Sequence, residues 1–207
     1  MKHIKEYIHF TNQYAIKHAK VQIIINSAIF VVLAIASFFV MQFLPIDSVK
    51  ELYEAISEML NSKDLTNSDG TLSFWGVFLN NLKACGLISL SGLIPILFLP
   101  VMYLAINAGV IGGFMGIIDV MTEANVILMF VMFVLPHGVF EIPAMILSGA
   151  IGSKLCAFYY RKMFGFAKEE KFLFHIKGCL GMFIFYAFPL LLIAGFIEAV
   201  VLSAVYL

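Results

Sequence analysis

Charge is scarce in this 207-residue chain, in which Lys, Arg, Asp and Glu together make up 13% of the residues and hydrophobic residues make up 62%. Soluble domains carry about 25% charged and about 45–50% apolar residues. Net charge is also missing, because 13 basic residues balance 13 acidic ones. Binding to nucleic acid requires a basic surface, so the composition argues against nucleic acid as a partner. The composition is that of an integral membrane protein, whose first partner is the lipid bilayer.

Cysteine is sparse as well. Cys85, Cys156 and Cys179 lie far apart and form no CxxC pair. The spacing therefore indicates neither a disulfide framework nor a thiolate metal site, and we expect three small buried apolar side chains. The alternating polarity of a membrane β-barrel is also missing. The apolar runs are continuous instead, which predicts an all-α fold of membrane helices.

Long apolar runs are the main feature that the chain does have, and they predict one helical membrane domain over residues 1–207. Each span takes roughly 20 residues, which allows about five spans. Apolar residues at helical spacing among charges predict two further helices that lie on the membrane surface. The predicted order is a surface helix 1–20, span one 21–44, an outer loop 45–73 with an amphipathic helix 48–60, span two 74–90, span three 93–118, span four 124–158, a loop 159–173 and span five 174–206.

Span four is too long for a simple crossing, because a helix over residues 124–158 would extend about 50 Å. Pro136 and Gly138 supply a reason for a break. Proline cannot donate to the helical hydrogen-bond ladder and disfavours helical geometry in the residue before it. We therefore predict two pieces, with the second helix beginning near Pro136, and a kink at Pro189 in span five.

The distribution of charge predicts the orientation of the chain. Residues 1–20 and 159–177 are rich in lysine, whereas residues 45–73 and the turn near Asp119 and Glu123 are mainly acidic. Basic segments stay on the cytoplasmic side. We expect a multi-pass protein of the cell membrane with a cytoplasmic N-terminus and an extracytoplasmic C-terminus. The apolar run at 21–44 is too long for the core of a cleavable signal, so we expect it to remain as the first span.

Four charged side chains nevertheless lie inside the apolar stretches: Lys83, Glu141, Lys154 and Glu198. A charge in the bilayer costs several kcal/mol unless it is paired or hydrated, so such groups are candidates for function. Lys154 lies near the cytoplasmic end of span four, and we expect its long side chain to reach the lipid headgroups. For Lys83 two interpretations remain: a partly interfacial second span, or an ion pair with one of the two glutamates.

His137 and Glu141 are one helical turn apart and therefore lie on the same face, which small residues continue. Small residues let helix backbones approach closely in lipid. We predict that spans three, four and five pack tightly through them and bring the polar groups together, although the face on span three can equally serve a homodimer. The packing positions are Gly109, Gly112, Gly113, Gly116, Ser148, Gly152 and Gly195.

Convergence of these helices would form an intramembrane polar cluster of Asn80, Asn81, Asn107, His137, Glu141 and Glu198. Three roles remain open for it. A His and a Glu at this spacing can supply two metal ligands, although HEXXH is absent and no third ligand is obvious. Chains of such groups carry protons or ions in transporters. The third role is a hydrogen-bonded network that fixes helix register. We predict no catalytic residue, no cofactor and no metal, with His137 and Glu141 as the candidates if a metal does bind.

Four stretches in order resemble the stage II sporulation protein M family: FLNNLKACG from Phe78, LAINAGVIGG from Leu104, LPHGVFEIPAMILSGAIG from Leu135 and AGFIEAVV from Ala194. They contain the whole polar cluster. The resemblance implies a non-enzymatic membrane scaffold for peptidoglycan-degrading partners during sporulation engulfment or related envelope remodelling. The outer loop is too short for a hydrolase domain but can offer a helix to such a partner. The alternatives are a small transporter or channel that uses the His/Glu/Asn cluster and, third, a metal-dependent intramembrane enzyme.

Overall fold

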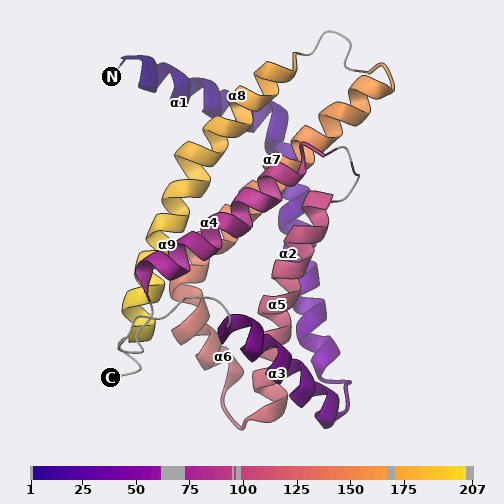
Figure 1. Cartoon of the computed structure of the whole chain (residues 1–207), viewed down its shortest axis with the longest axis vertical. Helices are drawn as coiled ribbons and strands as arrows, with labels where there is room; N and C mark the ends of the chain where they lie inside the picture. Colours follow the sequence, from indigo (N-terminus) through magenta and orange to yellow (C-terminus); the bar gives the residue numbers. More distant parts are fainter. Residues whose placement is uncertain (1, 62–72, 95, 97–98, 167–170, 204–207) are drawn as a thin grey trace.

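All secondary structure in the described part of the chain is helical, which confirms the predicted all-α fold (Figure 1). The computed structural model describes residues 2–61, 73–94, 96, 99–166 and 171–203, with the side chains of 59–61 and 201–203 left out. The second part of the outer loop, 62–72, and the end of predicted span five, 204–206, therefore lie outside the described residues.

The first helical run joins three elements without a gap: α1, Lys2–Tyr14, the π-helical segment η1, Ala15–Ala19, and α2, Lys20–Met41. In Figure 1, α1 turns away from the direction of α2 and meets α8, Phe172–Met182. Thr11 and Tyr14 are buried, so one side of α1 packs on protein rather than on lipid. Residues 1–20 were predicted to lie on the membrane surface. Only the side of α1 opposite Thr11 and Tyr14 is free to do so.

The amphipathic helix of the outer loop is α3, Ile46–Asn61. Val49 on α3 is fully buried and forms a small core with Met41 of α2 and Ile117 of α5, Leu99–Met121. The apolar side of α3 therefore rests on the ends of two long helices of the same chain.

Within the described residues, four helical runs are long and apolar enough to cross a membrane: Lys2–Met41, Leu99–Met121, Val126–Met163 and Phe172–Val200. The helix α4, Phe74–Ser91, corresponds to predicted span two but carries Asn80, Asn81 and Lys83, and it is not among these four. The number of five spans therefore stays a prediction.

The predicted interruption of span four is wrong, because the chain remains helical from α6, Val126–Met129, through the π-helical segment η2, Phe130–Val134, into α7, Leu135–Met163. A second wide turn, η3, Phe183–Ala187, joins α8 to α9, Phe188–Ser203. Each of these two segments ends two residues before a proline, Pro136 or Pro189. A wider turn relieves the clash of the proline ring with the preceding turn, so the helix changes its hydrogen bonding instead of stopping.

The glycine face of α5 packs against α2 and not against predicted spans four and five. A Cβ on Gly112 would overlap the carbonyl oxygen of Ala34, and a Cβ on Gly116 would lie 2.8 Å from the Cγ of Met41. Gly109 and Gly113 also face α2. Because α2 covers these four glycines, this face is closed to a second copy of the chain.

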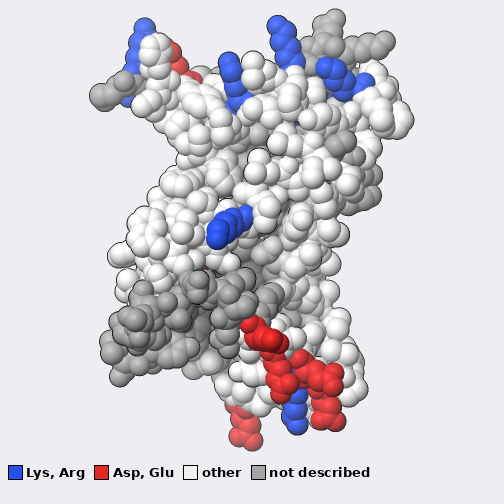
Figure 2. Space-filling model, viewed as in Figure 1, with Lys and Arg blue, Asp and Glu red and all other residues white. Residues whose placement is uncertain are grey.

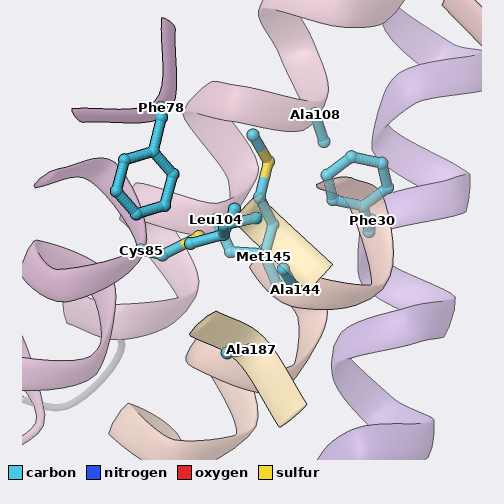
Figure 3. Packing of buried hydrophobic residues seen from close by; sticks show 9 residues of the cluster. Phe30, Phe78, Cys85, Leu104, Ala108, Ala144, Met145 and Ala187 are labelled. Carbon is cyan, nitrogen blue, oxygen red and sulfur yellow. The ribbon is translucent and has the colours of Figure 1, made fainter. Parts of the chain in front are cut away.

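The main hydrophobic core lies where α2, α4, α5, α7, η3 and α9 meet (Figure 3). Met145 of α7 lies near the centre of the view, with Leu104 and Ala108 of α5 beside it and Phe30 of α2 on one side. Small residues such as Ala144 bring the helices close enough for these side chains to interlock. The buried members of this core are Phe30, Phe78, Cys85, Leu104, Ala108, Ala144, Met145, Ala187 and Leu191.

Charge separates to the two ends of the molecule. Figure 2 shows most basic side chains at the end that carries the N-terminus and the acidic ones mainly at the end that carries α3. Between them lies a broad uncharged surface with one basic side chain at mid-height. Large apolar residues are exposed on this belt, among them Val32 and Ile35 of α2, Ile106 of α5 and Phe196 of α9. Such a surface is suited to lipid.

Candidate functional site

Three ionisable side chains from two helices meet at one point. α7 presents His137 and Glu141 one turn apart, and α9 brings Glu198 to them. One ligand atom from each, a ring nitrogen or a carboxylate oxygen, lies within 4.8 Å of the other two. Glu198 is thus a third potential metal ligand, which sequence spacing did not reveal because it is 57 residues from Glu141 and on another helix.

All six residues of the predicted polar cluster line one cavity of about 400 Å³. α4 contributes Asn80 and Asn81, α5 contributes Asn107, and α7 and α9 contribute the ionisable groups. Ile56 of α3 also lines this cavity, so it extends towards the acidic end of the molecule. Most other described residues that line the cavity are aliphatic, so its polar side-chain atoms are confined to the six residues of the polar cluster.

Local hydrogen bonds occupy the amide nitrogens of Asn80 and Asn107. Asn107 Nδ2 donates to the carbonyl oxygen of Tyr103 at 2.8 Å, and Asn80 Nδ2 donates to Asn81 Oδ1 at 3.1 Å. His137 Nδ1 is buried and has no hydrogen-bond partner in the described part of the chain. A buried ring nitrogen without a partner is costly, so the imidazole lacks an interaction that a ligand can provide.

Neither glutamate has a basic partner among the described residues. The two salt bridges formed there join His3 to Glu6 and Lys50 to Asp47, far from the cavity. Lys83 is exposed on α4 and makes no ion pair with Glu141 or Glu198, which rules out the paired interpretation. Two carboxylates therefore share a partly buried site without a protein cation.

Small side chains bring α9 close to α4 and α7 at the level of the site. A Cβ on Gly195, one turn before Glu198, would lie 3.2 Å from the Cβ of Phe78. Ala194 of α9 and Ala144 of α7 are fully buried. Gly138 has more room, since its nearest neighbours are side-chain atoms 3.6 and 3.7 Å away. The predicted role of Gly195 in packing thus involves α4.

Beyond the site, towards the basic end, α7 packs closely on α4 and α5. A Cβ on Gly152 would lie 2.5 Å from the carbonyl oxygen of Ile88 and 2.7 Å from the Cβ of Pro100. Ser148 is fully buried, and its carbonyl accepts a hydrogen bond from Ser89 Oγ at 3.5 Å. The cavity is therefore closed on this side by backbone contacts.

A second polar group lies at the basic end and was missed by sequence reasoning. The Tyr14 hydroxyl is 2.9 Å from His175 Nδ1 and 3.6 Å from Cys179 Sγ, all of them buried. Lys154 is 94% shielded from solvent, so the prediction that it extends to the lipid headgroups is wrong. Tyr14 is near the N-terminus, whereas His175 and Cys179 are near the C-terminus, so their contact could not be read from sequence spacing. The one feature that could have indicated a site here is His175, a polar residue among apolar neighbours.

The fold and the site together define a helical membrane protein with a cluster of ionisable and amide side chains inside its bundle. The model of one family, stage II sporulation protein M, matches residues 26–201, which is most of the chain. The chain therefore belongs to the stage II sporulation protein M family, as its motifs had suggested. Neither a curated protein nor a solved structure matches it.

Proposed function

We propose that the chain is a non-enzymatic membrane scaffold that holds peptidoglycan-remodelling partners at the end carrying α3, during sporulation engulfment or related envelope remodelling. Membership of the family supports this role. The observation that carries the proposal is the attachment of α3, which is fixed to the bundle on one side and presents its other side to solvent.

The exposed side of α3 has the mixed chemistry of a docking surface. Glu51, Glu54 and Glu58 are exposed on the side opposite Val49. Leu52 and Tyr53 lie at the two edges of the Val49 side, where their exposed fractions are 37% and 42%. Partially exposed tyrosine and leucine within an acidic surface can supply apolar anchors and a charged rim. Because Val49 already holds the helix in place, a partner would not have to order it on binding.

Site-specific photo-crosslinking in cells of a peptidoglycan-containing host tests this proposal. A photoreactive amino acid replaces Tyr53 on α3 or, as the matched control, the exposed Met163 at the opposite end of the molecule. We expect crosslinked complexes from position 53 to degrade peptidoglycan in a zymogram, and complexes from position 163 not to do so. Equal activity from both positions, or none from position 53 in a host that expresses the partner, would contradict the proposal.

A small transporter or channel is the second candidate, favoured by the ionisable side chains in the cavity that reaches towards α3. Passage of a proton or ion would need a route past Gly152 to the basic end, where the helices are in backbone contact. Transport therefore requires α7 to move relative to α4, which scaffolding does not.

Flux into proteoliposomes separates the two candidates. If the chain transports a cation or proton, a pH-sensitive or potential-sensitive dye should report uptake that Glu141→Gln abolishes and Glu54→Gln on exposed α3 leaves intact. The scaffold proposal predicts wild-type flux no greater than that of protein-free liposomes.

A further inference from the structure

We propose that His137, Glu141 and Glu198 bind one divalent transition-metal ion, which ties α7 to α9 inside the bundle. The site is independent of the scaffold role, since it is built from α7 and α9 and not from the exposed side of α3. The metal would stabilise the relative position of two helices that sequence places far apart.

The donor atoms are suited to such an ion in kind and in spacing. One imidazole and two carboxylates are ligands that zinc accepts in proteins, at about 2.0–2.2 Å from the ion. Tetrahedral coordination at that radius places ligand atoms roughly 3.4 Å apart. The three atoms lie within 4.8 Å of one another, so each has to move inward by roughly 1 Å or less, which glutamate side-chain rotation allows.

Charge favours a divalent cation over an empty site. When ionised, the two carboxylates bring two negative charges together in a partly buried site. Their mutual repulsion and desolvation are unfavourable, and no described basic residue pairs with them. A divalent ion makes the site neutral in one step, whereas an exposed Lys83 cannot approach it.

Two atoms of the cavity can interact with a bound ion: a ring nitrogen of His137 and the side-chain oxygen of Asn107. His137 Nδ1 is buried and has no hydrogen-bond partner among the described residues, so one nitrogen of this ligand ring is available to bind the ion. Asn107 donates through Nδ2 to Tyr103, which leaves Oδ1 as its acceptor atom. Asn107 lines the same cavity and can provide a fourth oxygen or hold a coordinated water.

The chemistry selects the class of ion. Calcium takes six to eight oxygen ligands, and magnesium favours octahedral oxygen coordination with several waters, so a site with one imidazole and few oxygens suits neither well. Imidazole with carboxylate is suited to zinc, iron or manganese. Among these, zinc has the highest intrinsic affinity, which makes Zn²⁺ the probe of choice.

Metal analysis of the full chain is the first test. Protein carrying no polyhistidine tag is purified in detergent without chelators and analysed by elemental mass spectrometry. We expect about one equivalent of a divalent transition metal per chain, loss of that metal in chelator together with a lower melting temperature, and recovery of both when Zn²⁺ is added. A wild-type protein that holds no metal and whose melting temperature does not respond to Zn²⁺ would overturn the proposal.

Conservative variants assign the site. Glu141→Gln and Glu198→Gln keep side-chain size, and each should weaken Zn²⁺ binding by more than the roughly 10–100-fold typical of outer-shell partners. Glu54→Gln and His3→Gln change the same residue types at exposed positions and should bind Zn²⁺ like the wild type. If Glu141→Gln and Glu198→Gln bound Zn²⁺ with wild-type affinity, the ion would have to bind elsewhere, and the assignment of these two ligands would be refuted.

Cobalt spectroscopy gives an answer even if those variants fold poorly. Co²⁺ added to chelator-treated wild type should show the visible bands of nitrogen–oxygen coordination, without a thiolate charge-transfer band, because the three proposed ligands include no cysteine. His137→Cys should add that band, since the new thiolate would replace the imidazole as a ligand. A spectrum of hexa-aqua cobalt in the wild type, or no new band in a folded His137→Cys protein, would count against the site. Neither result depends on partner capture through α3.

Discussion

Single glycines decide how closely the helices of this bundle approach. At Gly112 the missing Cβ leaves space for the carbonyl oxygen of Ala34, and at Gly152 it leaves space for that of Ile88. Gly86 of α4 differs, because nothing lies within 4 Å of the position that its Cβ would take. The same residue type therefore has opposite significance at these positions, since in lipid close backbone contact replaces the hydrophobic effect as the source of helix association.

We predict that Gly112→Ala and Gly86→Ala change stability in opposite directions. Gly112→Ala must push α5 away from α2, and overpacking of this kind costs about 1–3 kcal/mol. Gly86→Ala adds no clash and gains helix propensity, up to about 1 kcal/mol. The change in stability of each variant is measured as the shift of its thermal unfolding midpoint in detergent. A Gly112→Ala protein as stable as wild type would show that α2 and α5 do not pack as closely as described.

At the scale of the element, α3 is held by few contacts compared with the long helices. Its buried contribution to the small core with Met41 and Ile117 is Val49, with Ile56 partly buried nearby. The free energy of local unfolding is therefore lower for α3 than for the bundle that supports it. The attachment of α3 can therefore be weakened without unfolding the remainder of the chain.

We predict that Val49→Asp releases α3 and leaves the bundle intact. A carboxylate at this fully buried position would be desolvated without a partner, which α3 avoids by lifting off. Hydrogen exchange should become faster across residues 46–58 and stay unchanged in α7. Ala55→Asp introduces the same charge at an exposed position of the same helix, so it is the control and should leave exchange at wild-type rates. Equal acceleration in both variants would mean that Val49 does not anchor α3.

The wide turns η2 and η3 act at the same scale, since both allow a proline in a continuous helix. Pro136 opens α7 one residue before His137, and Pro189 opens α9 nine residues before Glu198. Each wide turn changes the rotation of the helix that follows it. The directions in which His137 and Glu198 point therefore depend on these turns as well as on helical periodicity.

For the whole molecule, the separation of charge indicates how the chain lies in a membrane. Basic side chains gather at one end and acidic ones mainly at the other, with an uncharged belt between them (Figure 2). The positive-inside rule then predicts that the N-terminus and the α7–α8 connection face the cytoplasm and that α3 lies outside. The extracytoplasmic C-terminus stays a prediction as well, because residues 204–207 lie outside the described part.

Cysteine labelling in intact cells checks this orientation. The three native cysteines are buried, so the background should be low. Glu54→Cys on α3 should react with a membrane-impermeant maleimide in intact cells, whereas Lys162→Cys should react only after the membrane is permeabilised. Both positions are exposed, so accessibility from one side is what differs. The reverse pattern would invert the proposed orientation and place α3 in the cytoplasm.

The sequence by itself determined the membrane class, the helical fold and the six polar residues of the cavity. Burying ionised Glu141 or Glu198 in an apolar helix has a cost that depends on residue type and not on topology, so composition alone could select such residues. Asn80, Asn81 and Asn107 were selected as polar residues in the same apolar stretches, and the family motifs contain them as well. The end of α4 at Ser91 was also close to prediction, because glycine acts locally.

Only the tertiary structure decided which helices meet. Small residues on α5 indicate close packing, but every helix with small residues is a suitable partner, and α2 rather than α7 or α9 lies against Gly112. The burial of Lys154 could not be predicted for the same reason. Its position near a helix end suggests access to the lipid headgroups, but neighbouring helices cover it in the folded bundle. Glu198 lies beside His137 and Glu141 because α9 packs beside α7, a contact between distant segments that no periodicity within either helix contains.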